Sequence, residues 1–374
     1  MRRAGGSGPR RPEAMAQTRH SEQSGCFCFK PAEEEWDGCR PTSPRTISYV
    51  NAAPHVGHAL EYVQADAFAR YRRQLGQTVR LQTGTDDNSL KNALAAEAEG
   101  VPVQDLVSRN AQAFREVLDA LAAAYDGFLQ TSIDPVHRAG VATLWEACNA
   151  AGAIYRRAYR GLYCVGCEQY YTEDELTPEG LCPDRPEPIE EENYFFRLTR
   201  YAAELRARIV GGALRIAPAS RRNEVLALID CGLQDFSISR SVDRAHGWGI
   251  PVPGDPSQVV YVWFDALANY ITALDAHNYR TFWPGEGGPA EGGAPPLRLH
   301  VIGKGVLRFH AVYWPAMLLA AGLPLPTDIV VHGYFTVAGR KMSKRRWGGL
   351  RPGTRTQEPS PVFPRLEVDR RGPL

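Results

Sequence analysis

Hydrophobic and polar positions along the middle of the chain alternate between the short period of strands and the longer period of amphipathic helices. We expect an extended segment at 47–50, a strand at 78–83 and strands at 259–264, 297–302 and 328–331. Between them the spacing predicts helices over 55–75, from after Ser89, and over 103–125, 135–151 and 307–321. Strands that alternate with helices predict an α/β fold with a parallel sheet.

A different pattern interrupts this alternation. Residues 160–192 are dense in Gly, Pro, Cys and acidic side chains, which is typical of an insertion held by a metal instead of an apolar core, and a helical pattern resumes over 193–209. We therefore predict a Rossmann-like nucleotide-binding fold split in two, with a first half at 46–149, an inserted zinc-knuckle domain at 150–258 and a second half at 259–344.

The two ends of the chain lack either period. We expect a disordered leader at 1–45 and an unstructured tail at 345–374, both rich in Arg, Pro and Gly and foreign to the body, as in a GC-rich gene read out of frame. No apolar run precedes Tyr49, so we also expect the first strand of the sheet to be missing.

Composition narrows the classes of protein. The chain has 374 residues, of which 44% are apolar and 23% charged, and this composition excludes general disorder. Its formal net charge of +1 excludes a general polyanion binder, so any nucleic-acid site must be local. The longest apolar run, 311–326, is too short and too rich in proline to span a bilayer, so we expect no membrane partner. Eight cysteines in a chain of this length are no disulfide scaffold, and we expect a cytoplasmic protein.

The segment His55-Val-Gly-His58 opens the first long helix. Its two imidazoles are three residues apart and share one helix face, and a helix N-terminus is a site that suits phosphate. A surface histidine pair or two metal ligands would give the same tetrapeptide.

The segment Lys341-Met-Ser-Lys344 follows the strand predicted at 328–331. Two ammonium groups that flank a small hydroxyl side chain can bind a leaving pyrophosphate. A solvated basic loop is the alternative.

Together the two segments resemble the paired signatures of class I aminoacyl-tRNA synthetases, and residues 46–344 resemble methionyl-tRNA synthetases. The matching blocks include YVNAAPHVGHALEYVQADAFARY, LQTGTD, GLYCVGCEQYYTEDEL, WGIPVPGDP, YVWFDAL and VVHGYFTVAGRKMSK. The resemblance implies a methionine-tRNA ligase that uses ATP with Mg²⁺ to form methionyl-adenylate and then charges the acceptor end of tRNA(Met).

The resemblance also implies roles for individual residues. Asp86 would bind the α-ammonium group of methionine, although it could instead cap a helix. The ATP phosphates and the leaving pyrophosphate would be bound by His55, His58, Arg240, Gly303, Lys341 and Lys344. The methionine side chain would be enclosed by Ile47, Tyr49, Trp263, Tyr270, Phe309 and His310, with the Tyr270 hydroxyl or the His310 ring near sulfur. Plain core packing is the alternative for these aromatic residues, and a surface salt bridge is the alternative for Arg240.

Three cysteines in the inserted segment have the spacing of a zinc knuckle. Cys164 and Cys167 form a C-x-x-C pair, and Cys182 follows. In the family a fourth ligand comes three residues after the third cysteine, where this chain has Arg185. Asp184 or a water could complete a structural zinc site, and a metal-free knuckle is the alternative.

Further departures from the family leave other functions open. Gly305 stands where the family often has an aspartate for the ATP ribose, and the helical anticodon-binding domain expected after Lys344 has no counterpart. A different class I adenylating ligase, or a fragment with little or no ligase activity, therefore stays an alternative. The oligomeric state cannot be predicted.

Overall fold

The computed structural model describes residues 47–164, 186–285 and 296–333, together with the backbone of short strands within 41–44, 169–171, 335–337, 340–341 and 367–368. The chain divides into two units, Met1–Asp37 and Gly38–Leu374, and every described residue belongs to the second. This second unit is a mixed α/β fold built around a parallel sheet, as predicted.

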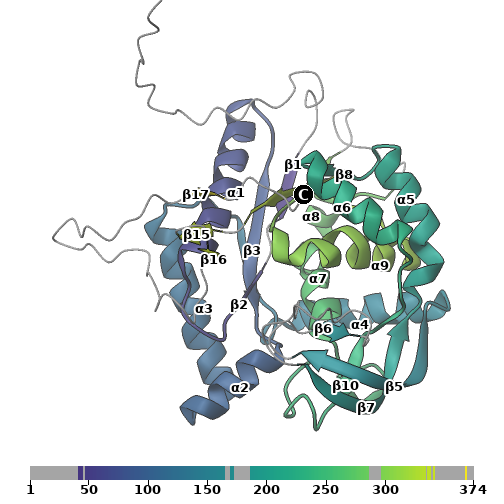
Figure 1. Ribbon diagram of the computed structural model, residues 1–374. Coiled ribbons are helices and arrows are strands. Elements are labelled where there is room, and N and C mark those ends of the chain that lie inside the picture. The colour runs from purple at the N-terminus through teal and green to yellow at the C-terminus, as the bar shows by residue number, and fades with distance from the viewer. Residues whose placement is uncertain are drawn as a thin grey trace, which may run out of the picture. The chain divides into compact units, whose positions relative to one another are not determined.

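Seven parallel strands form the central sheet (Figure 1). They are β1 (Pro41–Pro44), β2 (Ser48–Tyr49), β3 (Arg80–Asp86), β4 (Gly127–Gln130), β8 (Arg215–Ala217), β13 (Leu297–Gly303) and β14 (Asp328–His332). The path runs β2-β3-β1-β13-β14-β8, and β4 also pairs with β3. The carboxyl ends of β2, β3, β13 and β14 therefore meet at one edge, where ligands bind in sheets of this kind.

Strand β1 corrects the prediction of a disordered leader and a missing first strand. Its backbone pairs with Leu297 and Arg298 of β13 on one side and with residues 80–82 of β3 on the other, so residues 41–44 occupy an inner position of the sheet. Prolines at both ends of this four-residue strand removed the apolar pattern by which sequence analysis finds strands.

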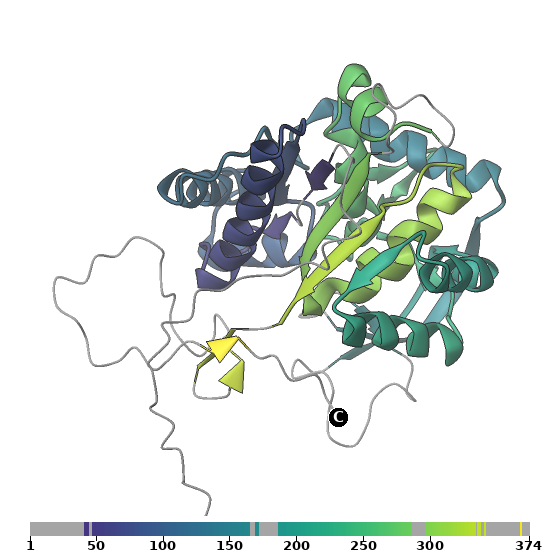
Figure 2. The same ribbon diagram turned by 90° about the horizontal axis from the view of Figure 1, so that it is seen from above.

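Nine α-helices are described within these ranges: α1 (Val56–Gln74), α2 (Leu90–Glu99), α3 (Val103–Ala120), α4 (Pro135–Ala150), α5 (Ala202–Val210), α6 (Ala219–Asp230), α7 (Val262–Thr272), α8 (Ala276–Phe282) and α9 (Trp314–Ala320). Figures 1 and 2 show α1 and α3 on one side of the central sheet and α9 on the other. The predicted helix starts are confirmed where a capping side chain marks them. Ser89 accepts from the backbone N–H of Lys91 at 3.1 Å, and Asp134 accepts from Val136 at 2.8 Å, ahead of α2 and α4.

Helix α7 corrects the strand predicted at 259–264. Strand β12 (Asp255–Val260) ends at Val260, and the chain turns at Tyr261 into the helix. All residues of α7 except Ile271 are buried. A helix surrounded by protein on every side has no polar face, so its sequence lacks the helical period and resembles a buried strand.

The helix predicted over 307–321 is present from residue 307 to residue 320, but it contains a π-helical turn. A 3₁₀ turn, η3 (Lys304–Val306), precedes a π-helical turn, η4 (Phe309–Tyr313), which continues into α9. A π turn accommodates one extra residue per turn and is frequently found at functional sites, and this one contains Phe309 and His310.

The inserted segment contains antiparallel sheets. Strands β5 (Ile154–Cys164), β6 (Gln169–Tyr171), β7 (Glu187–Phe196) and β9 (Phe236–Ser237) form one, and β10 (Ser239–Ser241), β12 and β11 (Pro251–Val252) form another. The helix predicted over 193–209 is wrong at 193–196, which belong to β7; a 3₁₀ turn, η2 (Leu198–Tyr201), separates β7 from α5. The segment also contributes β8 to the central sheet, where it pairs with β14.

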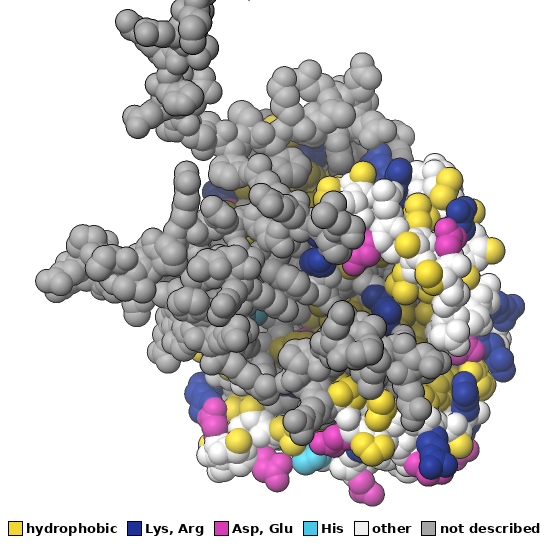
Figure 3. Space-filling model, in the orientation of Figure 1, with side chains coloured by type: hydrophobic (Ala, Val, Ile, Leu, Met, Phe, Trp, Pro, Cys, Tyr) yellow, Lys and Arg dark blue, Asp and Glu magenta, His cyan; other side chains and the backbone are white. Residues whose placement is uncertain are grey.

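A small third antiparallel sheet involves the segment predicted as a tail. It joins β15 (Phe335–Val337), β16 (Arg340–Lys341) and β17 (Glu367–Val368), so the prediction of an unstructured tail is wrong for residues 367–368. Among the described residues, no helix has the length and apolarity needed to cross a bilayer. On the surface drawn in colour in Figure 3, acidic and basic side chains are interspersed.

Candidate functional site

The two histidines of the first motif organise the N-terminus of α1. His55 precedes the helix, and its Nδ1 accepts from the backbone N–H of Gly57 at 3.1 Å, while Nδ1 of His58 accepts from the backbone N–H of His55 at 3.1 Å. The rings stack with their centroids 3.9 Å apart. Because Nδ1 accepts in both rings, the proton of each neutral imidazole lies on Nε2, which can donate to an anionic oxygen.

Gly57 is required by this stack. A Cβ added at Gly57 would lie 2.8 Å from Cε1 of the His55 ring, closer than carbon atoms approach. The glycine therefore lets the His55 ring lie against the first turn of the helix.

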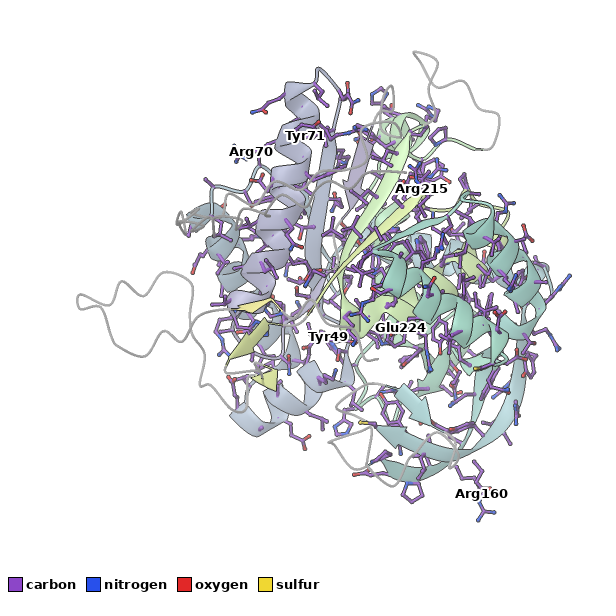
Figure 4. All side chains as sticks on the ribbon, turned by 45° about the horizontal axis from the view of Figure 1, so that its top comes forward. Tyr49, Arg70, Tyr71, Arg160, Arg215 and Glu224 are labelled. Atoms are coloured by element: carbon purple, nitrogen blue, oxygen red, sulfur yellow. The ribbon has the colours of Figure 1, made fainter. Side chains whose placement is uncertain are left out.

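An aromatic cluster forms beside the carboxyl end of β2. Trp263 of α7 stacks on Phe309 of η4 with centroids 3.7 Å apart, and its edge meets Tyr49 at 6.1 Å and His310 at 6.3 Å. Tyr270 of α7 hydrogen-bonds to His310 at 2.7 Å. The structure thus brings together Tyr49, Trp263, Tyr270, Phe309 and His310 from three separate parts of the chain, while Ile47 is half-buried two residues before Tyr49. Figure 4 shows Tyr49 in the central part of the molecule.

The proton positions in this cluster follow from the backbone. His310 Nδ1 lies 2.9 Å from the carbonyl oxygen of Val306, which can only accept, so Nδ1 carries the proton. Burial lowers the pKa of His310 to about 4, so the ring is neutral near pH 7 and its Nε2 accepts the hydroxyl proton of Tyr270. The cluster is therefore polar without being charged, which suits a thioether.

His300 extends this cluster and was missed by sequence analysis. Its ring lies 4.1 Å from Tyr270 and 6.0 Å from His310, and it is fully buried on β13. Burial is the main cause that lowers the pKa of His300 well below 6.5, and electrostatic interactions with His310 and Arg298 lower this pKa further, because protonation of His300 is disfavoured beside another titratable imidazole and a guanidinium group. A lone histidine inside an apolar strand carries no sequence signal beyond its type.

Asp86 ends β3 beside the aromatic cluster. The β2–β3 register places Asp86 opposite Tyr49, and the Asp86 side chain is buried. The ammonium group of Lys91 lies 4.2 Å above the ring of Tyr49. Helix α2 is capped by Ser89, so the alternative of Asp86 as its N-cap is wrong. A buried carboxylate beside the cluster can bind an ammonium group.

Arg240 of β10 is buried, which rules out the alternative of a surface salt bridge. Its guanidinium donates to the hydroxyl of Tyr163 and lies 4.5 Å above that ring and 5.7 Å from the ring of Tyr261. This arrangement joins β10 to the end of β5.

The remaining predicted residues lie at the limits of the described structure. Gly303 ends β13 opposite His332, and the backbone of Lys341 forms part of β16. Cys164 is buried at the end of β5. Cys167, Cys182 and Lys344 lie outside the described residues, as does the side chain of Lys341. Within the described ranges no three metal-ligating side chains gather.

Comparisons with known proteins identify the family of the chain. The family model described as "tRNA synthetases class I (M)" matches residues 43–187 and 180–361. A methionine–tRNA ligase of Mycobacterium tuberculosis (strain CDC 1551 / Oshkosh) is 43% identical over 309 residues, which cover 80% of this chain and 56% of that protein. A chloroplastic/mitochondrial methionine–tRNA ligase of Arabidopsis thaliana is 43% identical over 82% of this chain and 49% of that protein.

Solved structures give the same result. A Mycobacterium tuberculosis methionyl-tRNA synthetase in complex with methionyl-adenylate matches with a TM-score of 0.74 and 41% identity, over 82% of this chain and 60% of that one. The chain thus spans about half to three-fifths of the length of these relatives.

Proposed function

Because the chain belongs to the methionine branch of the class I tRNA synthetases, we propose that it activates L-methionine with ATP and transfers the methionyl group to tRNA(Met). The observation that carries the proposal is the juxtaposition of a buried carboxylate, Asp86, with the uncharged aromatic cluster around Trp263 and Tyr270. The carboxylate can pair with an α-ammonium group, and the aromatic cluster can make soft contacts with a thioether.

In the first step a carboxylate oxygen of methionine attacks the α-phosphorus of ATP, and the bond to the β-phosphate breaks as pyrophosphate leaves with its electron pair. The Nε2–H groups of His55 and His58 would donate to the phosphate oxygens, and Lys341 and Lys344 would stabilise the leaving pyrophosphate. Mg²⁺ bound with ATP would offset further phosphate charge. Asp86 and the aromatic cluster hold methionine so that its carboxylate faces the nucleotide.

Two further residues would complete the nucleotide site. Gly303, at the carboxyl end of β13, would let the backbone approach ATP. Arg240 would add positive charge near the phosphates, supported by its fixed position between two tyrosine rings.

In the second step a hydroxyl of the tRNA 3′-terminal ribose attacks the adenylate carbonyl, and AMP leaves. The inserted segment at 150–258 would contact the single-stranded acceptor end through bases and backbone. Arg160 is exposed near the end of β5 and extends from this segment into solvent in Figure 4, where it can reach a phosphate. The cytoplasmic location stays a prediction.

Methionine-dependent ATP–pyrophosphate exchange tests the proposal. We expect His58→Ala to lower exchange by roughly 10²- to 10³-fold, because one preorganised hydrogen bond to the developing charge is removed. His277→Ala, which changes an exposed histidine of α8, is the matched control and should leave exchange unchanged. Exchange driven equally well by leucine, or equal rates for the two variants, would reject the proposal.

We further propose a structural zinc ion in the inserted segment, held by Cys164, Cys167 and Cys182. Support comes from the donor set, three soft thiolates with knuckle spacing, and from the buried thiol of Cys164 at the end of β5. Elemental analysis should find about one zinc per chain, and Cys164→Ser should abolish it, whereas Cys231→Ser, at an exposed cysteine, should not. A zinc-free purified protein would favour the metal-free knuckle.

A further inference from the structure

The loop between β3 and α2 is fixed to other elements immediately after Asp86. The side-chain amide of Asn88 donates to Oδ2 of Asp265 at 2.7 Å and to the carbonyl of Thr131 at 3.3 Å. The backbone N–H of Asp87 donates to the hydroxyl of Thr131 at 2.9 Å. The loop that follows Asp86 is thereby joined directly to α7.

Asp265 is held from its other side by α4. Its Oδ1 accepts from Nε2 of His137 at 2.5 Å, and Nδ1 of the same ring lies 2.6 Å from the hydroxyl of Thr272, two turns further along α7. The side chains of His137 and Asp265 are both fully buried. Water does not reach this depth to satisfy a polar group whose hydrogen bond is broken, so the chain Asn88–Asp265–His137–Thr272 fixes one geometry.

Helix α7 also supplies two residues of the aromatic cluster. Trp263 lies two residues before Asp265, and Tyr270 lies five residues after it. The Asn88–Asp265 hydrogen bond therefore joins the loop that follows Asp86 to the helix that carries two of the cluster residues.

The carbonyls on the loop are held as well. The side-chain amide of Asn92 donates to the carbonyls of Asp86 at 3.0 Å and of Asp87 at 2.7 Å, and the indole of Trp248 donates to the carbonyl of Asp87 at 2.7 Å. Asn92 thus holds the loop from α2, Trp248 holds it from the segment between β10 and β11, and the Asn88–Asp265 bond holds it to α7.

We propose that Asn88 and Asp265, with His137 behind them, are positioning residues that fix the distance between the Asp86 carboxylate and the Trp263–Tyr270 cluster, and so select the length of the amino-acid side chain. This inference rests on the proposed function. A ligand whose ammonium group binds Asp86 and whose sulfur reaches the cluster must have the length that this link sets.

Amino acids that are one methylene group shorter or longer than methionine test whether this link sets the distance between Asp86 and the cluster. Exchange is measured with methionine, with S-methylcysteine, which is one methylene shorter, and with homomethionine, which is one longer. We expect Asn88→Ala to reduce the kcat/KM preference for methionine over both homologues by roughly tenfold, since a hydrogen bond to a charged group is removed. The KM for ATP should not change.

Asn278→Ala is the matched control. Asn278 of α8 also donates its side-chain amide to an aspartate, Asp275, at 2.7 Å, but in a helix cap away from the aromatic cluster. Its preference for methionine should equal that of the unmodified chain. Asp265→Asn, which keeps the shape of the side chain, should relax the preference in the same direction as Asn88→Ala and serves if Asn88→Ala folds poorly.

The outcomes separate the two proposals. If the unmodified chain shows no methionine-dependent exchange, the proposed function fails and the inference falls with it. If the unmodified chain is active but Asn88→Ala and Asp265→Asn retain its preference among the three amino acids, only the inference is overturned. A change confined to thermal stability or kcat, with the preference intact, would likewise assign these residues a purely structural role.

Discussion

Asp87 places a carboxyl group in the interior beside the network that joins α4 and α7. Burial raises its pKa to about 6, and the negative charge of Asp265 adds to the rise, whereas hydrogen bonds from Thr85 and Ser132 oppose it. Ser132 donates its hydroxyl at 2.8 Å. Near pH 7 the folded protein therefore holds a desolvated carboxylate at a cost to its stability.

The raised pKa of Asp87 determines how the stability of the protein changes with pH. Between about 3.8 and 6 the folded state retains the Asp87 proton that the unfolded state has lost, so the free energy of unfolding falls as pH rises through this window. Asp87→Asn removes the titration. The free energy of unfolding of this variant minus that of the unmodified chain should be higher at pH 7.5 than at pH 4, by up to about 3 kcal/mol, because only the unmodified chain loses stability as the pH rises. Urea unfolding at several pH values measures this difference.

Asp275→Asn is the control for this experiment. Asp275 caps α8, and its pKa is lowered, chiefly by the backbone N–H of Asn278. The difference in free energy of unfolding between Asp275→Asn and the unmodified chain should therefore be constant between pH 5 and 7.5 and change only at lower pH. A difference for Asp87→Asn that is constant from pH 4 to 7.5, or that grows as pH falls, would contradict the raised pKa.

At the residue scale, sequence analysis found groups that lie in contiguous motifs. His55 and His58 share a helix turn, and Asp86 follows a strand, so local spacing was sufficient to select them. The pair of His137 and Asp265 is separated by 128 positions in the sequence. His137 lies in none of the matching blocks, and Asp265 lies in the block YVWFDAL but was given no role there. Only the packing of α4 on α7 brings the two side chains together.

At the scale of the element, α4 and α7 pack closely because of one glycine. A Cβ at Gly140 of α4 would lie 2.3 Å from Cγ2 of Thr272 and 3.2 Å from its Cβ on α7. The same threonine contacts Nδ1 of His137 through its hydroxyl. The absence of a side chain at 140 thus permits both the helix packing and the buried hydrogen bond.

Gly140→Ala should destabilise the protein by roughly 1–3 kcal/mol, because overpacking outweighs the gain of about 1 kcal/mol in helix propensity. Urea unfolding measures the change. The double variant Gly140→Ala with Thr272→Ser removes the clashing methyl group and keeps the hydroxyl, so it should recover part of the loss. A single variant as stable as the unmodified chain would mean that α4 and α7 separate at little cost.

Element prediction succeeded where local signals were complete and failed where burial, in α7, or proline, in β1, removed them. Ser89 and Asp134 marked the starts of α2 and α4. Helix α7 carries no polar face and was assigned to a strand, and β1 carries no apolar run and was assigned to a leader. Both elements are recognised only through their neighbours in the sheet and core.

At the scale of the whole molecule, parallel pairing gathers the candidate site from distant segments. Tyr49, Asp86 and Gly303 stand at the carboxyl ends of β2, β3 and β13, and α7 and η4 add the aromatic cluster. The order of strands follows from right-handed crossovers between parallel strands, which sequence patterns do not specify. The resemblance to a family implied a split Rossmann-like fold, and the strand order itself comes from the structure.

The charge of the molecule sets how it would meet tRNA. The formal net charge is +1, and the surface drawn in Figure 3 mixes both signs, so binding must depend on a few local cations. Arg160 is such a cation in the proposed acceptor-end contact, because it is exposed and lies in the antiparallel sheet of the inserted segment, opposite Glu190 in the β5–β7 register.

Arg160→Gln should weaken binding to a hairpin that carries the tRNA acceptor end, and it should also make the dependence of affinity on salt shallower. Removing one ion pair with a single-stranded phosphate lowers the slope of log K against log salt by about 0.7. Arg222→Gln, at an exposed arginine of α6, is the matched control and should leave affinity and slope unchanged. Affinities measured at three or more salt concentrations give the slopes. Equal slopes for the unmodified chain and Arg160→Gln would mean that the acceptor end does not contact this part of β5, because a cation that neutralises no phosphate releases no counterion.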